Sequence, residues 1–251
     1  MLVWTHQPLS LYEKLLVRGV IHCDPDHEEF GKDYVTAYKW IAKQMEYRIG
    51  KPPKNVRYPF WAWALLDGNP IKKPDLRRSE FNNSGTVGEQ VLIELEIPDT
   101  DVLLSDEENW HYVLNNWYLQ NKNGEVEADM WFDNLSADEQ EPIVKEALYT
   151  QEKYSDIADT DADGSYDWLM REKVDAWLKS LPPNERVLKE RKSWEKIFDK
   201  DDPDNDWEFV QATFWELRAE QVKSVRQYTG LGTNGALRII EGGRADKEAE
   251  N

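Results

Sequence analysis

Residues 90–97 read Gln-Val-Leu-Ile-Glu-Leu-Glu-Ile, the most regular two-residue alternation in the chain. The aliphatic residues that share one side are Val91, Ile93, Leu95 and Ile97. Glu94 and Glu96 occupy the alternate positions, and successive strand side chains point to opposite faces. The segment therefore predicts a strand with one buried and one wetter face.

Three further segments have strand character, namely residues 2–5, 58–66 and 207–217. The segment 58–66 is apolar on both faces, which predicts cover on both sides. Between the first two strands, Pro8 and Gly19 bracket one predicted helix, and an apolar stripe from Phe30 to Met45 predicts a second.

The order of these elements predicts an α+β domain over residues 1–228 with a small mixed or antiparallel sheet. Residues 136–198 are expected to form three helices inserted before the last strand, which we assign to 207–217. Residues 229–251 are Gly-rich and charged, so we expect a flexible tail.

The composition restricts the class of protein. The 251 residues include 49 acidic and 31 basic side chains, a formal net charge of −18, and 12 tryptophans. This charge disfavours broad non-specific binding to nucleic acid, which needs clustered Lys and Arg. No apolar run reaches the roughly 18–20 residues that span a bilayer, and Cys23 is the single cysteine. We expect a cytoplasmic protein without a membrane partner, whose macromolecular partner or acceptor the sequence does not identify.

Two short motifs resemble ligand loops. Residues 230–235 match G-x-G-x-x-G, but no βαβ unit follows, so we interpret them as tail. The residues Asp159, Asp161 and Asp163, followed by Gly164, match the first half of a calcium loop, whose position 12 is Met170 in place of a bidentate Glu. A solvated acidic turn is the main interpretation, and a weak calcium site is the alternative. The histidine spacing predicts no other metal site.

Glu216 is the most informative polar residue. Alternation over 207–217 places it on the same face as Val210, Ala212 and Phe214. A buried carboxylate is paired, lies at a rim or has a function. The residues Trp4-Thr5-His6-Gln7 on the first strand could face a cleft or solvent, and residues 73–78 form a basic loop.

Several segments together resemble a bacterial and phage family that is catalogued as a domain of unknown function. They are the opening W-T-x-Q, the strand at 58–63, residues 74–77, the strand at 91–98 running into 104–106, and Gln-Ala-Thr-Phe-Trp-Glu at 211–216. The resemblance covers most of residues 1–228 and implies a fold more than an activity.

The layout is also similar to the ADP-ribosyltransferase superfamily, whose members cleave the glycosidic bond of NAD. That resemblance implies an NAD cofactor and a catalytic Glu216. It assigns NAD binding to the first strand (Thr5, His6, Gln7), a nicotinamide wall to Trp61 or Trp63, and a phosphate contact to Arg77. The chain departs from the superfamily pattern, since it has no Ser-Thr-Ser segment and no Glu-x-Glu or Gln-x-Glu on the last predicted strand.

The first hypothesis is therefore an NAD-binding, ADP-ribosyltransferase-like protein that acts on a protein or nucleic-acid acceptor. It requires Glu216 to point into an aromatic-walled hollow beside the first strand. The alternatives are a non-enzymatic acidic protein that binds a basic partner, in phage–host conflict or defence, and a calcium-regulated protein.

Overall fold

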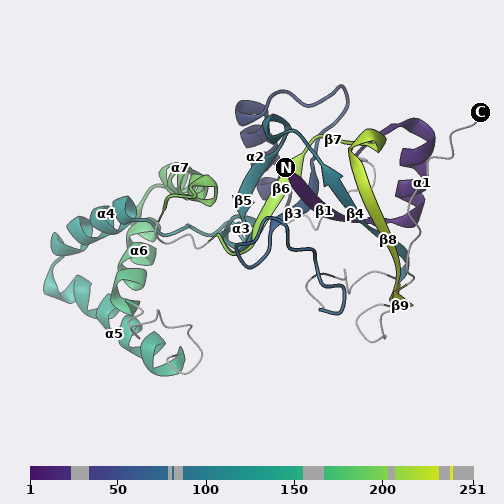
Figure 1. Ribbon diagram of the computed structural model, residues 1–251. Helices are drawn as coiled ribbons and strands as arrows, with labels where there is room; N and C mark the ends of the chain where they lie inside the picture. Colours follow the sequence, from purple (N-terminus) through teal and green to yellow (C-terminus); the bar gives the residue numbers. More distant parts are fainter. Residues whose placement is uncertain are drawn as a thin grey trace, which may run out of the picture. The chain divides into compact units, whose positions relative to one another are not determined.

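The computed structural model describes residues 1–23, 34–78, 81, 87–154, 167–202, 207–231 and 238–239 (Figure 1). The chain divides into two compact units. Met1–Asn115 and Ile197–Asn251 form the first, and Asn116–Lys196 form the second. The helical unit thus spans 116–196, whereas we expected a helical insert at 136–198.

The first unit is built on a sheet of seven strands within the described residues. In spatial order these are β5 (Leu103–Asp106), β6 (Val210–Phe214), β3 (Phe60–Leu65), β1 (Leu2–Pro8), β4 (Val87–Glu96), β8 (Val222–Leu231) and β9 (Arg238–Ile239). All neighbouring strands pair antiparallel. The α+β class predicted from the sequence is confirmed, and of the two predicted kinds of sheet, mixed or antiparallel, the structure has the antiparallel one. β1 lies at the centre of the sheet.

One face of the sheet packs against α1 (Leu9–Arg18), and we call it the α1 face. Val3 of β1, Ile93 of β4 and Leu15 of α1 are fully buried there in one cluster. Pro8 precedes α1, and Gly19 ends it with a left-handed φ of 75°, donating its N–H to the Leu15 carbonyl. The predicted start and stop of this helix are thus confirmed.

The opposite face carries the alternate residues of the same strands, and we call it the aromatic face. Its members on the five central strands include Trp4, His6, Trp61, Trp63, Gln90, Leu92, Glu94, Gln211, Thr213, Arg226 and Tyr228. Helices α2 (Val35–Arg48) and α3 (Glu107–Leu114) contact this face, because Tyr38 and Trp110 both pack against Trp61. The sequence predicted a cap for α2 at residues 24–26 and an apolar stripe from Phe30, and these positions lie outside the described residues.

The strand predicted at 207–217 is shorter in the structure. β6 ends at Phe214, which pairs with Phe60, the first residue of β3. Pro59 precedes Phe60 and has no backbone N–H. The hydrogen-bond ladder between β3 and β6 therefore does not continue beyond the Phe60–Phe214 pair. The chain bends at Trp215 and forms β7 (Glu216–Arg218), which pairs with β2 (Val20–His22) in a separate two-stranded sheet. The assignment of 207–217 to one last strand was wrong.

β8 follows β7 and was not predicted. It pairs with β4 from Val87 to Leu95, and β9 pairs with its end. The predicted tail began at residue 229, but residues 229–231 belong to β8, and β9 also lies within that range. Gly230 and Leu231 are the start of the G-x-G-x-x-G match. Residues 232–237 and 240–251 lie outside the described residues.

The second unit contains α4 (Lys122–Asp133), α5 (Ala137–Tyr154), α6 (Trp168–Ser180) and α7 (Pro183–Ser193). Trp177 of α6 packs in a buried cluster with Ala128 of α4, and Tyr118 contacts its ring edge-on. The Trp194 indole donates to the Trp117 carbonyl at 2.7 Å. α4 was not predicted.

In the part of the chain that is described, no helix combines the length and apolar character needed to cross a bilayer.

Candidate functional site

A row of side chains crosses the aromatic face at the level of Trp4. Ser105 on β5 pairs with Gln211 on β6, Gln211 with Trp63 on β3, and Trp63 with Trp4 on β1. Glu94 on β4 continues the row beside Trp4. Because neighbouring strands lie about 4.8 Å apart, these five side chains form a continuous line.

A second row runs beside the first. Antiparallel pairing of Trp4 with Trp63 places His6 beside Trp61, two residues further along each strand. His6 pairs with Leu92, and Leu92 pairs with Arg226 on β8. The two rows bring residues from the first 10 and the last 50 positions of the chain onto one surface.

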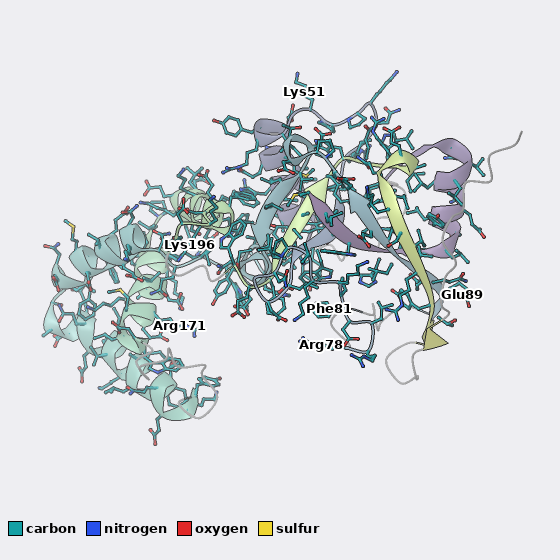
Figure 2. The ribbon with its side chains drawn as sticks, viewed as in Figure 1. Lys51, Arg78, Phe81, Glu89, Arg171 and Lys196 are labelled. Atoms are coloured by element: carbon teal, nitrogen blue, oxygen red, sulfur yellow. The ribbon has the colours of Figure 1, made fainter. Side chains whose placement is uncertain are left out.

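Aromatic rings surround these rows. The Trp61 ring lies 4.8 Å from that of Trp110 and 6.0 Å from that of Tyr38, measured between centroids. Trp63 meets Phe81 edge-on at 5.4 Å. The Arg78 guanidinium lies 5.0 Å from the centre of the Phe81 ring, and Figure 2 labels the two together. Trp61 and Trp63 are half-buried, so both rings keep some exposed surface.

Six buried side-chain atoms in the described part of the chain have no hydrogen-bond partner, and all six belong to this face. They are Trp4 Nε1, His6 Nε2, Trp61 Nε1, Gln90 Oε1, Ser105 Oγ and Gln211 Oε1. An unpaired buried polar group costs about 1–3 kcal/mol, and folded proteins pair nearly all of them. Six such atoms gather on one face of one sheet, and this makes the aromatic face the candidate site.

His6 is neutral at physiological pH, since burial lowers its pKa from 6.5 to about 4. Its Nδ1 lies 2.9 Å from the Tyr228 hydroxyl, and Tyr228 is fully buried. Among the described residues, His6 Nδ1 is the acceptor available to the Tyr228 proton, so the phenol donates and Nδ1 accepts. The ring proton is then on Nε2, which is an unpaired donor.

The unpaired atoms supply both kinds of hydrogen-bonding group. The two indole N–H groups and His6 Nε2–H donate, the Gln90 and Gln211 amide oxygens accept, and the Ser105 hydroxyl does either. None of these groups carries a charge. They match a ligand whose planar part bears neutral donors and acceptors, such as a base or a carboxamide.

The structure divides the residues predicted on the first strand between the two faces. Thr5 and Gln7 alternate with His6 and point to the α1 face. The Thr5 hydroxyl donates to the Trp61 carbonyl at 2.7 Å and accepts from Gln7 Nε2 at 2.8 Å. Of the predicted NAD-binding residues, His6, Trp61 and Trp63 therefore share a surface, and Thr5 and Gln7 do not share it.

Arg77 lies in the loop between β3 and β4. Its guanidinium donates to both oxygens of Asp75 at 2.9 and 2.7 Å, and the side chain is exposed. The hydrogen bonds from Arg77 lower the pKa of Asp75 to about 2. Leu76 turns the other way and is buried against Trp4. Arg77 is thus held by its neighbour, so a phosphate would have to compete with Asp75.

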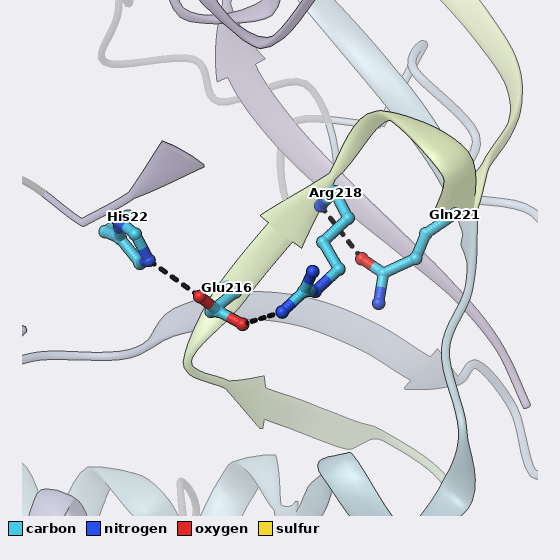
Figure 3. A network of polar contacts seen from close by, with 4 residues as sticks. All are labelled: His22, Glu216, Arg218 and Gln221. Atoms are coloured by element: carbon cyan, nitrogen blue, oxygen red, sulfur yellow. Dashed lines mark hydrogen bonds and ion pairs between the residues drawn. The ribbon is translucent and has the colours of Figure 1, made fainter. Parts of the chain in front are cut away.

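Glu216 belongs to a separate polar network on β7 (Figure 3). Its Oε1 lies 2.8 Å from His22 Nε2, and its other oxygen accepts from the Arg218 guanidinium. The backbone N–H of Arg218 donates to Gln221 Oε1 at 3.0 Å. Partial burial acts to raise the pKa of Glu216, but the hydrogen bonds from His22 and Arg218 outweigh it, and the pKa is lowered.

The Glu216 side chain does not point toward the aromatic face. Ile21 and Leu217, which alternate with His22 and Glu216, are buried in the cluster on the α1 face. His22 and Glu216 therefore point away from that cluster, while the aromatic face lies beyond the sheet on its other side. The structure does not bring Glu216 together with Trp4, His6 or Trp61.

The sequence placed Trp4 on a strand that could face a cleft, but it did not identify Gln90, Ser105, Gln211 or Tyr228 as site residues. The available signal was the alternation of polar and aromatic residues on β1 and β6, but the register of the six strands from β5 to β8 is needed to combine these residues. The candidate calcium ligands Asp159, Asp161 and Asp163 lie outside the described residues. Over the residues that are described, no group of three His, Cys, Asp or Glu side chains could hold a metal ion.

Comparison with known proteins gives a match to a family model. Neither the curated proteins nor the solved structures provide a match. A family described as "Domain of unknown function (DUF3841)" matches residues 2–223, which include β1 to β7 and the whole helical unit. The chain belongs to this DUF3841 family.

Proposed function

We propose that this protein binds NAD on the aromatic face and is an ADP-ribosyltransferase-like enzyme acting on a protein or nucleic-acid acceptor. The observation that carries the proposal is the set of six unpaired polar atoms on a sheet face lined with tryptophan. A neutral ligand of purely apolar character would leave all six unsatisfied. A nicotinamide group offers a planar ring together with a carboxamide that both donates and accepts.

The charge state of the face suits NAD. The nicotinamide ring of the oxidised cofactor is cationic, and aromatic ring faces attract cations. His6 stays neutral because burial lowers its pKa to about 4, so it does not repel that ring. In this proposal the half-buried Trp61 and Trp63 hold the ring, and Gln211 and the indole N–H groups meet the carboxamide.

Transfer of ADP-ribose requires cleavage of the bond between nicotinamide and the ribose C1′. The ribose then develops oxocarbenium character, which a nearby carboxylate stabilises. Glu216 is the candidate from the superfamily resemblance, but its network lies apart from the aromatic face. Glu94 is the carboxylate beside Trp4, where it accepts from Lys73 at 2.6 Å and from Ser224 at 2.7 Å.

Calorimetric titration with NAD tests the binding step. Trp61→Phe keeps an aromatic ring and removes one unpaired donor, so it should weaken NAD binding about tenfold. Trp194→Phe is the matched control in the helical unit and should leave NAD affinity unchanged. Absence of NAD binding by the wild-type chain would refute the proposal.

A second assay separates binding from transfer. NAD labelled on the adenylate is incubated with a cell lysate as acceptor, and incorporation is compared for wild type, Glu94→Gln and Glu216→Gln. Loss of incorporation with retained NAD binding identifies the carboxylate that acts in the reaction. Equal incorporation by both variants and wild type would exclude both carboxylates from that role.

One observation favours a non-enzymatic binding protein as the second candidate. Trp117 in the helical unit is 58% exposed in a chain of net charge −18, and tryptophan is common at interface hot spots. This function predicts capture of a basic partner that weakens steeply with salt and with Trp117→Ala, and that tolerates Trp61→Phe. Capture insensitive to salt would contradict it.

A further inference from the structure

Arg226 on β8 is an uncompensated cation on the aromatic face. It pairs with Leu92, which in turn pairs with His6, so it ends the row that begins at Trp61. Its side chain is exposed, and among the described residues no acid or acceptor contacts its guanidinium. An arginine without an ionic partner is notable here because acidic side chains outnumber basic ones by 49 to 31.

Three other described basic groups near this edge of the sheet are bound to carboxylates. Lys73 binds Glu94 at 2.6 Å, and Lys223 binds Glu96 at 2.6 Å. Arg77 is held by both oxygens of Asp75. Compared with these three side chains, Arg226 is a cation that a ligand can meet without first displacing a carboxylate of the described residues.

Arg226 also stands at a suitable distance from the unpaired groups. Two strand spacings, about 10 Å, separate its Cα from that of His6. Tyr228, two residues along β8 on the same face, reaches across β4 to hydrogen-bond His6. A long arginine side chain beside Tyr228 can therefore contact one end of a ligand whose planar end lies at Trp61 and His6.

We propose that Arg226 is the phosphate-binding residue of this site and that the ligand class is a nucleoside diphosphate or its ester. A guanidinium donates two parallel N–H groups to a phosphate, whereas a lysine ammonium acts as a point charge. This inference rests on the proposed function, because NAD carries such a diphosphate. Arg226 takes the phosphate-binding role that the ADP-ribosyltransferase resemblance assigned to Arg77.

The test compares three variants by calorimetry with NAD, ADP and nicotinamide as separate ligands. Arg226→Gln should weaken NAD and ADP about tenfold or more and leave nicotinamide unchanged. Arg226→Lys should recover part of the loss, since it keeps the charge and loses the fork. Arg18→Gln makes the same charge change at the end of α1, on the other face, and should bind all three as wild type does.

The outcomes distinguish this inference from the proposed function. If Arg226→Gln binds NAD and ADP as tightly as wild type, the phosphate role is wrong and NAD binding stands. If the wild type binds ADP through Arg226 but does not bind NAD, the phosphate role stands and the proposed function fails. If the wild type binds neither ADP nor NAD, both are refuted. The melting temperature of each variant verifies folding.

Discussion

The Tyr228 hydroxyl lies 2.9 Å from His6 Nδ1, and this bond connects β8 to β1 across β4. The two rings meet edge-on, with an interplanar angle of 83°. One hydrogen bond therefore orients the imidazole, fixes its tautomer and directs an N–H group to the aromatic face. Tyr228 itself belongs to none of the motifs recognised in the sequence, although β8 ends in the first two residues of the G-x-G-x-x-G match.

Replacing Tyr228 with Phe should destabilise the protein and disturb the site. The substitution keeps the buried ring and removes one hydrogen bond, which is worth about 1 kcal/mol in the free energy of unfolding. His6 Nδ1 loses its donor, so its two neutral tautomers should both become populated, which nitrogen NMR of the imidazole would detect. Tyr12→Phe on α1 is the control, and equal unfolding free energies for both variants would contradict the prediction.

Burial of His6 should make stability depend on pH between about 6.5 and about 4. The unfolded chain binds a proton as the pH falls through 6.5, while folded His6 stays neutral until about 4. The unfolded state thus holds more protons in this window, so the free energy of unfolding decreases as the pH falls. The full effect is about 3 kcal/mol.

Urea unfolding at a series of pH values measures this dependence. His6→Gln should show a smaller slope between pH 6.5 and 4 than wild type. His111→Gln is the matched control, because it makes the same substitution at an exposed side chain. A wild-type slope in the His6 variant would mean that other groups cause the dependence.

Two tryptophans in the same unit should respond differently to replacement with Phe. Trp61 Nε1 has no partner among the described residues, whereas Trp215 Nε1 donates to the Gly50 carbonyl at 3.0 Å. Each substitution removes an indole N–H and similar volume. Trp215→Phe should therefore lower the unfolding free energy by about 1 kcal/mol more than Trp61→Phe. A larger loss for Trp61→Phe would show that its N–H is already satisfied.

Gly19→Ala should destabilise the first unit by about 1 kcal/mol. Gly19 has a φ of 75°, where a Cβ is strained, although the space around that position is open. The cost therefore comes from the backbone alone. Val17→Ala on the exposed surface of the same helix is the control and should change the melting temperature little. An unchanged melting temperature for Gly19→Ala would contradict the left-handed cap.

Local signals explain the parts of the fold that the sequence predicted. Each of these signals depends on only a few neighbouring residues. The structure confirms the strand predicted from the alternation at 90–97 and the helix predicted between Pro8 and Gly19. β8 was missed because Lys223, Ser224, Arg226 and Gln227 give it a polar composition. β6 ended early because Pro59 terminates its partner strand, which is a pairing effect that residues 207–217 do not contain.

The candidate site also depends partly on local sequence signals and partly on strand pairing. The sequence by itself determined that Thr5 and His6 must point to opposite faces of a strand, since alternation follows from backbone geometry. It did not determine which face would carry the unpaired groups. Tertiary structure decided this, because the pairing of β1 with β3 and of β3 with β6 places Trp61 and Gln211 on the side of His6. It also moved Glu216 into a second sheet, since a strand continues only as far as its neighbour can hydrogen-bond it.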